Sequence, residues 1–198
     1  ARRVRFIEDL AIDEPSLTPV DPSEVGSQMA ALLIGKWEWF FSQNDSLSDW
    51  MKRLNFARQF DTQFSLSEEQ IRQFVEMAVF GKTSVKQVLE QDLVGLLESN
   101  LDRGWVKNFN EQVPARFTAA VGHTHKIDYS EPHASYVDVR LQEMFGVAVQ
   151  PKILGGKLPV TFRLLGPNYR PVQVTSDIAS FWKNAYVEVR KELRTRYP

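Results

Sequence analysis

The sequence contains no cysteine among its 198 residues. A disulfide scaffold, a thiolate metal site and a cysteine nucleophile are therefore excluded, and the composition fits a reducing compartment. No apolar run approaches the roughly 20 residues that a membrane-spanning helix needs. Ala1 to Leu10 carries charged residues throughout, unlike a signal peptide. These features predict a cytoplasmic protein without a membrane partner.

Neither sign of charge dominates, since the formal net charge is −1 at pH 7. This balance argues against a uniformly basic nucleic-acid-binding protein, but the distribution of charge matters more than the sum. Residues 150–198 contain nine Lys and Arg residues and only three Asp and Glu residues. The C-terminal end is therefore the basic part of the chain.

Helical spacing of apolar residues characterises the first half of the chain. Ser67 and Gln70 form a capping box, in which each side chain binds the backbone N–H of the other residue. The helix that follows is expected to stop at Gly81, because glycine commonly ends helices. The expected helices cover about 24–41, 47–59, 68–80 and a last stretch ending near Gly104.

Pro114 marks a change from helical to alternating apolar spacing. Gly122-His123 and Gly155-Gly156 are typical of hairpin turns. A short helix is expected at about 140–145, ended by Gly146. The expected strands cover about 116–121, 124–129, 148–154, 158–165 and 171–175.

These patterns predict an α+β fold, with a helical N-terminal half and a mixed β-rich C-terminal half closed by a long C-terminal helix. Five short strands are compatible with a small barrel but do not require one. We expect three segments: a strand and linker from an upstream domain at 1–23, a helical subdomain at 24–112 and a β-rich domain at 113–198.

The final helix is expected to begin after Thr175 or Ser176, either of which can serve as its N-cap. Asp177 would then lie in the first turn, where the helix dipole favours a negative charge. One apolar stripe at spacings of three and four predicts the buried side of this helix: Ile178, Phe181, Trp182, Ala185, Val189 and Leu193.

The segments RPVQVTSDIASFW (170–182) and YVEVRKELRTRYP (186–198) resemble the C-terminal region of HrpB-type bacterial ATP-dependent helicases of the DEAH class. Supporting segments in the same order and spacing are Ile127–Ser130, Val139–Gly146 and Gly156–Val160. The resemblance is strong over 113–198 and continues more weakly, in register, back to Arg2.

In that family the helicase motor lies upstream of this region, and its activity is ATP-driven unwinding of nucleic acid, chiefly RNA. The resemblance therefore implies a non-catalytic accessory region that guides nucleic acid to the motor or selects its substrate. The implied partners are the helicase core of the same parent chain and RNA or single-stranded nucleic acid. ATP and Mg²⁺ would bind in the motor, and no cofactor is expected in this region.

The sequence Gly81-Lys82-Thr83 is part of a phosphate-binding loop motif, but the rest of the motif is missing. The loop needs a second glycine five residues before the Gly-Lys pair, and that position is Glu76, inside a predicted helix. No glycine-flanked serine of a nucleophile elbow occurs either. We therefore predict no ATP hydrolysis by this chain and assign no catalytic residue.

His123 and His125 are two residues apart, so on a strand they share one face and can bind one metal ion. Asp128 would point to the opposite face, and His133 lies in a loop. Because no third ligand is placed, a solvated hairpin is the favoured interpretation, with a metal-dependent enzyme as a third functional hypothesis.

The basic C-terminal end is the main candidate for binding nucleic acid, since Arg and Lys neutralise phosphates and Tyr can stack on unpaired bases. Lys183, Tyr186 and Arg190 share a helix face by their spacing, and Arg194 continues it. An ordinary solvated helix is the alternative. The candidate residues are Arg140, Arg163, Arg170, Lys183, Tyr186, Arg190, Arg194 and Arg196.

A protein-docking module is the hypothesis of a different class. The tryptophans could include an exposed anchor for the helicase core or an outside partner, because large aromatic side chains dominate such interfaces. The candidates for this anchor are Trp37, Trp39, Trp50 and Trp105.

Overall fold

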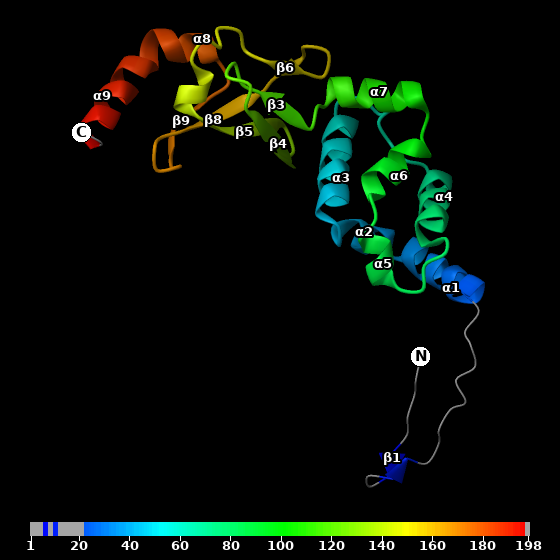
Figure 1. The fold of residues 1–198 in the computed structure, drawn as a ribbon. Coiled ribbons are helices and arrows are strands. Elements are labelled where there is room, and N and C mark those ends of the chain that lie inside the picture. Colours follow the sequence, from blue (N-terminus) through cyan, green and yellow to red (C-terminus); the bar gives the residue numbers. More distant parts are fainter. Residues whose placement is uncertain (1–5, 8–9, 12–21, 197–198) are drawn as a thin grey trace.

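The computed structural model describes residues 6–7, 10–11 and 22–196 of the chain. At the N-terminus, β1 (Phe6–Ile7) pairs with β2 (Leu10–Ala11) in an antiparallel arrangement. Most of the strand and linker expected at 1–23 lies outside the described residues, and Pro22 and Ser23 already belong to the first helix. Figure 1 shows the helices α1 to α7 grouped together, followed by the sheet and the last helix, at whose end the chain finishes. The described part contains no helix long and apolar enough to cross a membrane.

Helices occupy the chain from residue 22 to residue 112, as expected. They are α1 (Pro22–Gly35), α2 (Trp37–Ser42), α3 (Asp45–Arg58), α4 (Glu68–Val79), α5 (Val85–Leu89), α6 (Leu93–Ser99) and α7 (Arg103–Gln112). The capping box at Ser67 and Gln70 is confirmed, and Gly81 follows α4 with a φ of 69°.

Two expectations for this half are wrong. The single helix expected over 24–41 is interrupted at Lys36, which follows the poor helix former Gly35 and has a non-helical ψ of 37°. The break lets Phe40 and Phe41 both pack against Phe74, at centroid distances of 6.1 and 5.4 Å. Helix α7 was not expected, because Gly104 was taken as a terminator, whereas Asp102 caps a new helix by accepting from Trp105 N.

The second half forms an open five-stranded sheet with the order β3-β4-β5-β8-β9. Its strands are β3 (Arg116–Thr118), β4 (Thr124–Glu131), β5 (Ala134–Arg140), β8 (Thr161–Leu165) and β9 (Pro171–Thr175). Only β5 and β8 pair in parallel, and the other neighbours are antiparallel. Among the described residues β3 and β9 are the two edges and do not pair with each other, so the sheet does not close into a barrel.

The segment between β5 and β8 differs most from expectation. The predicted helix at 140–145 is a short 3₁₀ helix, η1 (Leu141–Met144), and the predicted strand at 148–154 shrinks to β6 (Lys152–Ile153). A hairpin over Gly155 and Gly156 pairs β6 with β7 (Leu158–Pro159), as the glycines indicated. Strand β5 itself was missed in the sequence.

The last helix is continuous from Ile178 to Arg196 but changes its winding. It comprises α8 (Ile178–Ser180), a π-helical turn η2 (Phe181–Ala185) and α9 (Tyr186–Arg196). The expected N-cap is wrong: Asp177 caps the helix by accepting from Ser180 N, because Thr175 Oγ1 accepts instead from Asp177 N. The predicted apolar stripe packs on the core as expected.

Arg53 of α3 binds the end of α7, at the point where the chain leaves the helical half for the sheet. Its buried guanidinium donates to Val113 O over 2.9 and 2.7 Å and to Asn110 Oδ1 over 2.6 Å. Burial lowers the pKa of Arg53, while the Coulombic effect of Tyr129 opposes that shift. Phe56 packs against Tyr129 of β4 at 4.9 Å, and burial raises the pKa of the Tyr129 hydroxyl. The two halves are therefore joined by specific buried contacts.

Candidate nucleic-acid interface

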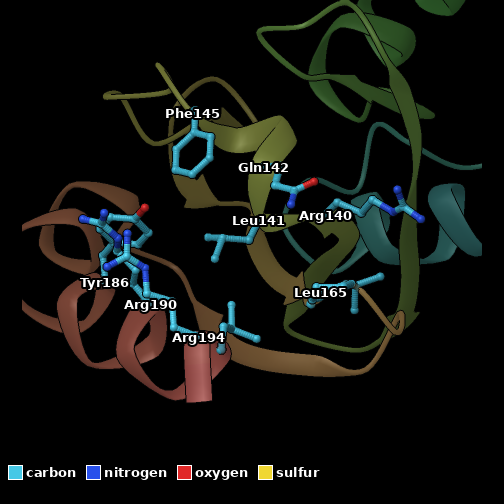
Figure 2. Close-up of a pocket in the computed structure, with 11 residues that line it drawn as sticks. Arg140, Leu141, Gln142, Phe145, Leu165, Tyr186, Arg190 and Arg194 are labelled. Carbon is cyan, nitrogen blue, oxygen red and sulfur yellow. The ribbon is translucent and has the colours of Figure 1, made fainter. Parts of the chain in front are cut away.

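A cavity of about 340 Å³ lies between one end of the sheet and the last helix, and we call it the arginine cavity (Figure 2). Its walls come from the end of β5, η1, the β8–β9 turn and α9. The lining residues are Arg140, Leu141, Gln142, Phe145, Leu165, Gly166, Pro167, Tyr186, Arg190, Leu193 and Arg194.

Helix α9 forms one wall because Tyr186, Arg190 and Arg194 follow each other at intervals of four residues and therefore share a face. Figure 2 shows these side chains on one side of the cavity, with Leu141 and Leu165 between them and Arg140. The side chain of Arg140 extends away from Tyr186 and Arg190 (Figure 2). The cavity thus has an apolar centre with cations around it.

The positive charge of the arginine cavity is not balanced locally. Its lining holds three arginines and no Asp or Glu. Within the described part of the chain, no carboxylate forms an ion pair with Arg140, Arg190 or Arg194. Uncompensated guanidinium groups beside a concave surface favour binding of an anion such as a phosphate.

Aromatic side chains continue the α9 wall of the arginine cavity. Tyr186 packs edge-on against Trp182 at 5.1 Å and against Phe145 at 5.9 Å. Trp182 is fixed by a 2.8 Å hydrogen bond from its Nε1 to Val147 O. Phe145 is 46% exposed at the edge of the cavity. Sequence reasoning missed Phe145, although an aromatic residue directly before the predicted terminator Gly146 was visible in the sequence.

The structure brings together four of the eight predicted residues, namely Arg140, Tyr186, Arg190 and Arg194. Arg170 is exposed in the adjoining β8–β9 turn, where its backbone N–H donates to Asn168 Oδ1 over 3.2 Å. Arg163 lies on β8 and forms ion pairs with Asp138 at 3.5 Å and Asp128 at 4.0 Å.

Lys183 does not line the arginine cavity, contrary to the expected common face with Tyr186 and Arg190. Lys183 itself lies within the wider π-helical turn η2, so the α-helical spacing used for the prediction does not apply there. Arg196 is the last residue of α9, and its side chain lies outside the described residues. A role of these eight residues in binding stays a prediction.

A second cavity, also of about 340 Å³, lies where α3 meets the sheet, and we call it the junction cavity. Its lining includes four cations (Lys52, Arg53, Arg116 and Lys126) and three acids (Asp49, Asp92 and Asp128). Asp49 forms ion pairs with both Lys52 and Lys126. Two of the four cations are therefore paired with an acid of the same lining.

The two histidines of the β3–β4 hairpin meet a carboxylate from η1. Glu143 Oε2 lies 2.6 Å from His125 Nε2 and 3.4 Å from His123 Nδ1. Asp128, the other candidate ligand, instead accepts from Ser130 N over 3.0 Å. No group of three His, Cys, Asp or Glu residues in the described ranges is arranged to hold a metal ion. The geometry therefore gives no support to the metal hypothesis.

The tryptophans provide little exposed anchor surface. Trp50 is buried and donates from Nε1 to Glu98 Oε1 over 2.9 Å. Trp105 stacks on Phe109 at 5.2 Å, and Trp37 packs edge-on against Phe41 at 5.5 Å. Trp39 is the exposed member of the predicted set. A more exposed aromatic side chain, which sequence reasoning missed, is Phe80 at the end of α4, at 85% exposure against 46% for Trp39.

A family model described as "ATP-dependent helicase C-terminal", of the HrpB type, matches residues 74–198, more than half of the chain. The chain belongs to this family. Its HrpB-type region includes all of the sheet and the last helix, and thus every residue that lines the arginine cavity. The resemblance inferred from residues 113–198 is confirmed.

Individual relatives agree with this assignment. The chain is 39% identical over 118 residues to a protein named ATP-dependent RNA helicase HrpB from Escherichia coli strain K12. That match covers 60% of the chain and 15% of the relative.

Two solved structures of E. coli HrpB are similar to the whole fold. One, titled as a DExH-box NTPase, has a TM-score of 0.76 and 28% identity over 96% of the chain. The other, titled as a DEAH/RHA helicase, has a TM-score of 0.70 and 27% identity over 100% of the chain. The chain spans 24% and 26% of the length of these two proteins.

Proposed function

We propose that this HrpB-type region is a non-catalytic accessory part of an ATP-dependent RNA helicase, and that its arginine cavity contacts the nucleic-acid strand. The observation that carries the proposal is the group of three arginines with no acid in the cavity lining. Such a group attracts the phosphate backbone regardless of base sequence. The role is to guide a strand towards the motor or to select the substrate.

The parent protein would supply the chemistry. A relative that covers 60% of the chain is named as an ATP-dependent RNA helicase, which favours RNA as the substrate and ATP with Mg²⁺ in the motor. The helicase core of the same parent chain would be the intramolecular partner, and the protein would act in the cytoplasm. The boundaries at 23/24 and 112/113 belong to the same proposal, with segment 113–198 as the nucleic-acid-contacting unit.

Charge reversal in the intact helicase tests this role. The double change Arg190→Glu and Arg194→Glu is expected to weaken binding of single-stranded RNA at least tenfold at low salt, because two attractive contacts become repulsive. Labelled RNA and fluorescence anisotropy measure the affinity.

The matched control is Lys86→Glu with Lys107→Glu, which reverses two exposed cations of α5 and α7 far along the chain from the cavity. The control should bind like the wild type. Equal affinity of the Arg190→Glu, Arg194→Glu variant and the wild type would contradict the proposal.

Phe80 favours docking as a second candidate function. It is 85% exposed and lies between two hollows, one lined by Gly26, Ala30 and Val79 and the other by Met77 and Leu96. The occupant we propose is the helicase core of the parent chain, since the solved relatives are about four times as long as this chain. Phe80→Asp should then weaken the contact between this region and the helicase core. Limited proteolysis of the intact helicase should cleave the variant faster between the two parts than the wild type, and an unchanged cleavage pattern would contradict docking at Phe80.

A further inference from the structure

Tyr169, in the β8–β9 turn, has a backbone conformation that bulky residues rarely adopt. Its φ is 60°, and the only other described non-glycine residue with positive φ is Leu154. This left-handed region costs free energy for a residue with a large side chain, and such strained positions cluster at ligand-binding sites. This conformation marks Tyr169 as a candidate ligand-binding residue.

Hydrogen bonds fix the turn that carries Tyr169. Tyr169 N donates to Gly166 O over 3.0 Å, and Gly166 N donates to Arg170 O over 2.9 Å. Gly166 and Pro167 of the same turn line the arginine cavity. The tyrosine is therefore held beside the cavity by a defined loop.

The ring of Tyr169 is exposed and carries a cation on one face. It is 65% exposed, and Arg140 lies over it with its guanidinium carbon 4.1 Å from the ring centroid. Arg140 also lines the arginine cavity, so one side chain links the ring to the cavity. No aromatic ring in the described part of the chain stacks on Tyr169, which leaves its other face for a ligand.

A second Arg–Tyr pair on the same sheet, Arg163 with Tyr136, differs from the Arg140–Tyr169 pair in how the charge of its arginine is compensated. Arg163 lies 4.2 Å from the ring centroid of Tyr136, almost the same distance, but Asp138 and Asp128 compensate its charge. Tyr136 is also half-buried within β5 and has a regular strand conformation. The Arg140–Tyr169 pair forms no ion pair with a carboxylate in the described part of the chain, so the positive charge behind the Tyr169 ring is not compensated in this way.

We propose that Tyr169 stacks on an unpaired base of a nucleic-acid strand whose phosphates contact Arg190 and Arg194. Stacking on a whole ring face requires a base that is free of its neighbours, which single strands offer and duplexes do not. Arg140 supports the platform from behind through its cation–π contact. The inference rests on the proposed function and names its substrate class, namely single-stranded nucleic acid.

The test uses Tyr169→Asn in the intact helicase. Asparagine tolerates the left-handed conformation, so the turn should be kept and its strain relieved. Affinity for single-stranded RNA should fall about 5- to 160-fold, the range for loss of one stacked base. The dependence of affinity on salt should stay the same, because no phosphate contact is removed. A fluorescent base analogue in the strand should be quenched by wild type and Tyr169→Phe, and not by Tyr169→Asn.

Tyr136→Asn is the matched control and should bind single-stranded RNA like the wild type. If Tyr169→Asn keeps wild-type affinity and quenching while Arg190→Glu with Arg194→Glu still weakens binding, the stacking inference is wrong and the proposed function stands. If none of these variants changes binding, both are wrong. An equal loss on single strands and duplexes with Tyr169→Asn also overturns the inference, since a stacking platform must discriminate between them.

Discussion

The arginine cavity and the junction cavity have the same volume of about 340 Å³, but they differ in how their charges are compensated. In the junction cavity, Asp49 pairs with Lys52 and Lys126, and the guanidinium of Arg53 binds backbone and amide oxygens. In the arginine cavity, three arginines have no described carboxylate partner. A similar number of cations therefore has two different uses. In the junction cavity they form contacts within the protein, and in the arginine cavity they stay available for a ligand. A chain with a net charge of −1 can therefore still hold a strongly positive site.

The largest effect is expected from Arg53→Ala, which removes the buried contact at the junction. Val113 O would lose its donors in a buried place, and Asn110 Oδ1 would lose its donor in a partly buried one. The stacking of Arg53 on Phe109 would also be lost. We expect the free energy of unfolding to fall by about 3 kcal/mol. Urea denaturation followed by circular dichroism measures it.

Arg163→Ala provides the comparison, because Arg163 forms ion pairs with partly exposed acids. Its replacement should lower the free energy of unfolding by less than about 1 kcal/mol. Similar losses for the two variants would show that the contacts of Arg53 do not have the structural role assigned to them.

The second largest effect is expected on RNA affinity, from a substitution of Gln142, which lines the arginine cavity. Gln142→Glu introduces a carboxylate of the same size and makes the arginine cavity resemble the junction cavity. One added charge at about 4 Å in water changes the binding free energy by about 1 kcal/mol, so affinity for RNA should fall about fivefold. Anisotropy titration of the intact helicase measures this, with Gln142→Met as the uncharged control. Wild-type affinity for the glutamate variant would count against the cavity as the contact site.

Asp49→Asn weakens both ion pairs of the junction cavity while keeping the shape of the side chain. Because Lys52 and Lys126 are largely exposed, the loss of unfolding free energy should be less than about 1 kcal/mol. RNA affinity should not change. A clear loss of RNA affinity without unfolding would instead place a binding surface at the junction.

The smallest effect is a pH dependence from Asp128. Partial burial acts to raise the pKa of this carboxyl group, but hydrogen bonds from Ser130 and the charge of Arg163 outweigh it and lower the pKa below the usual 3.8. A group whose pKa is lower in the folded state stabilises the fold above its unfolded pKa, and this contribution is lost as pH falls through the folded pKa. The free energy of unfolding, measured by denaturation at pH values from 5 down to 2, should therefore fall slightly less steeply for Asp128→Asn than for the wild type. A steeper fall would contradict the assigned direction.

Local signals were sufficient for much of the fold. The Ser67–Gln70 capping box gave the correct start of α4, and the paired glycines at 155 and 156 gave the correct hairpin turn, because each signal acts within a few residues. Strand β5 was missed although Val137 and Val139 alternate with Tyr136 and Asp138. The break at Lys36 follows the poor helix former Gly35, and the spacing of the apolar residues alone does not indicate it.

The candidate site could be predicted only in part. Helical spacing correctly placed Tyr186, Arg190 and Arg194 on one face of α9. Lys183 lies within the π-helical turn η2, whose spacing differs from that of an α-helix, so the spacing rule failed at that position. Phe145, Gln142 and the turn that holds Tyr169 join the site through pairing of β5 with β8, which no local pattern reveals.

The most direct measurement is the affinity of the intact helicase for single-stranded RNA across a series of salt concentrations. For single strands, log affinity falls with log salt by about 0.7 per phosphate contact. Arg190→Glu with Arg194→Glu should therefore reduce the steepness of this dependence by about 1.4, the equivalent of two phosphate contacts. A slope equal to that of the wild type would show that these arginines do not bind the strand, and would contradict the central claim.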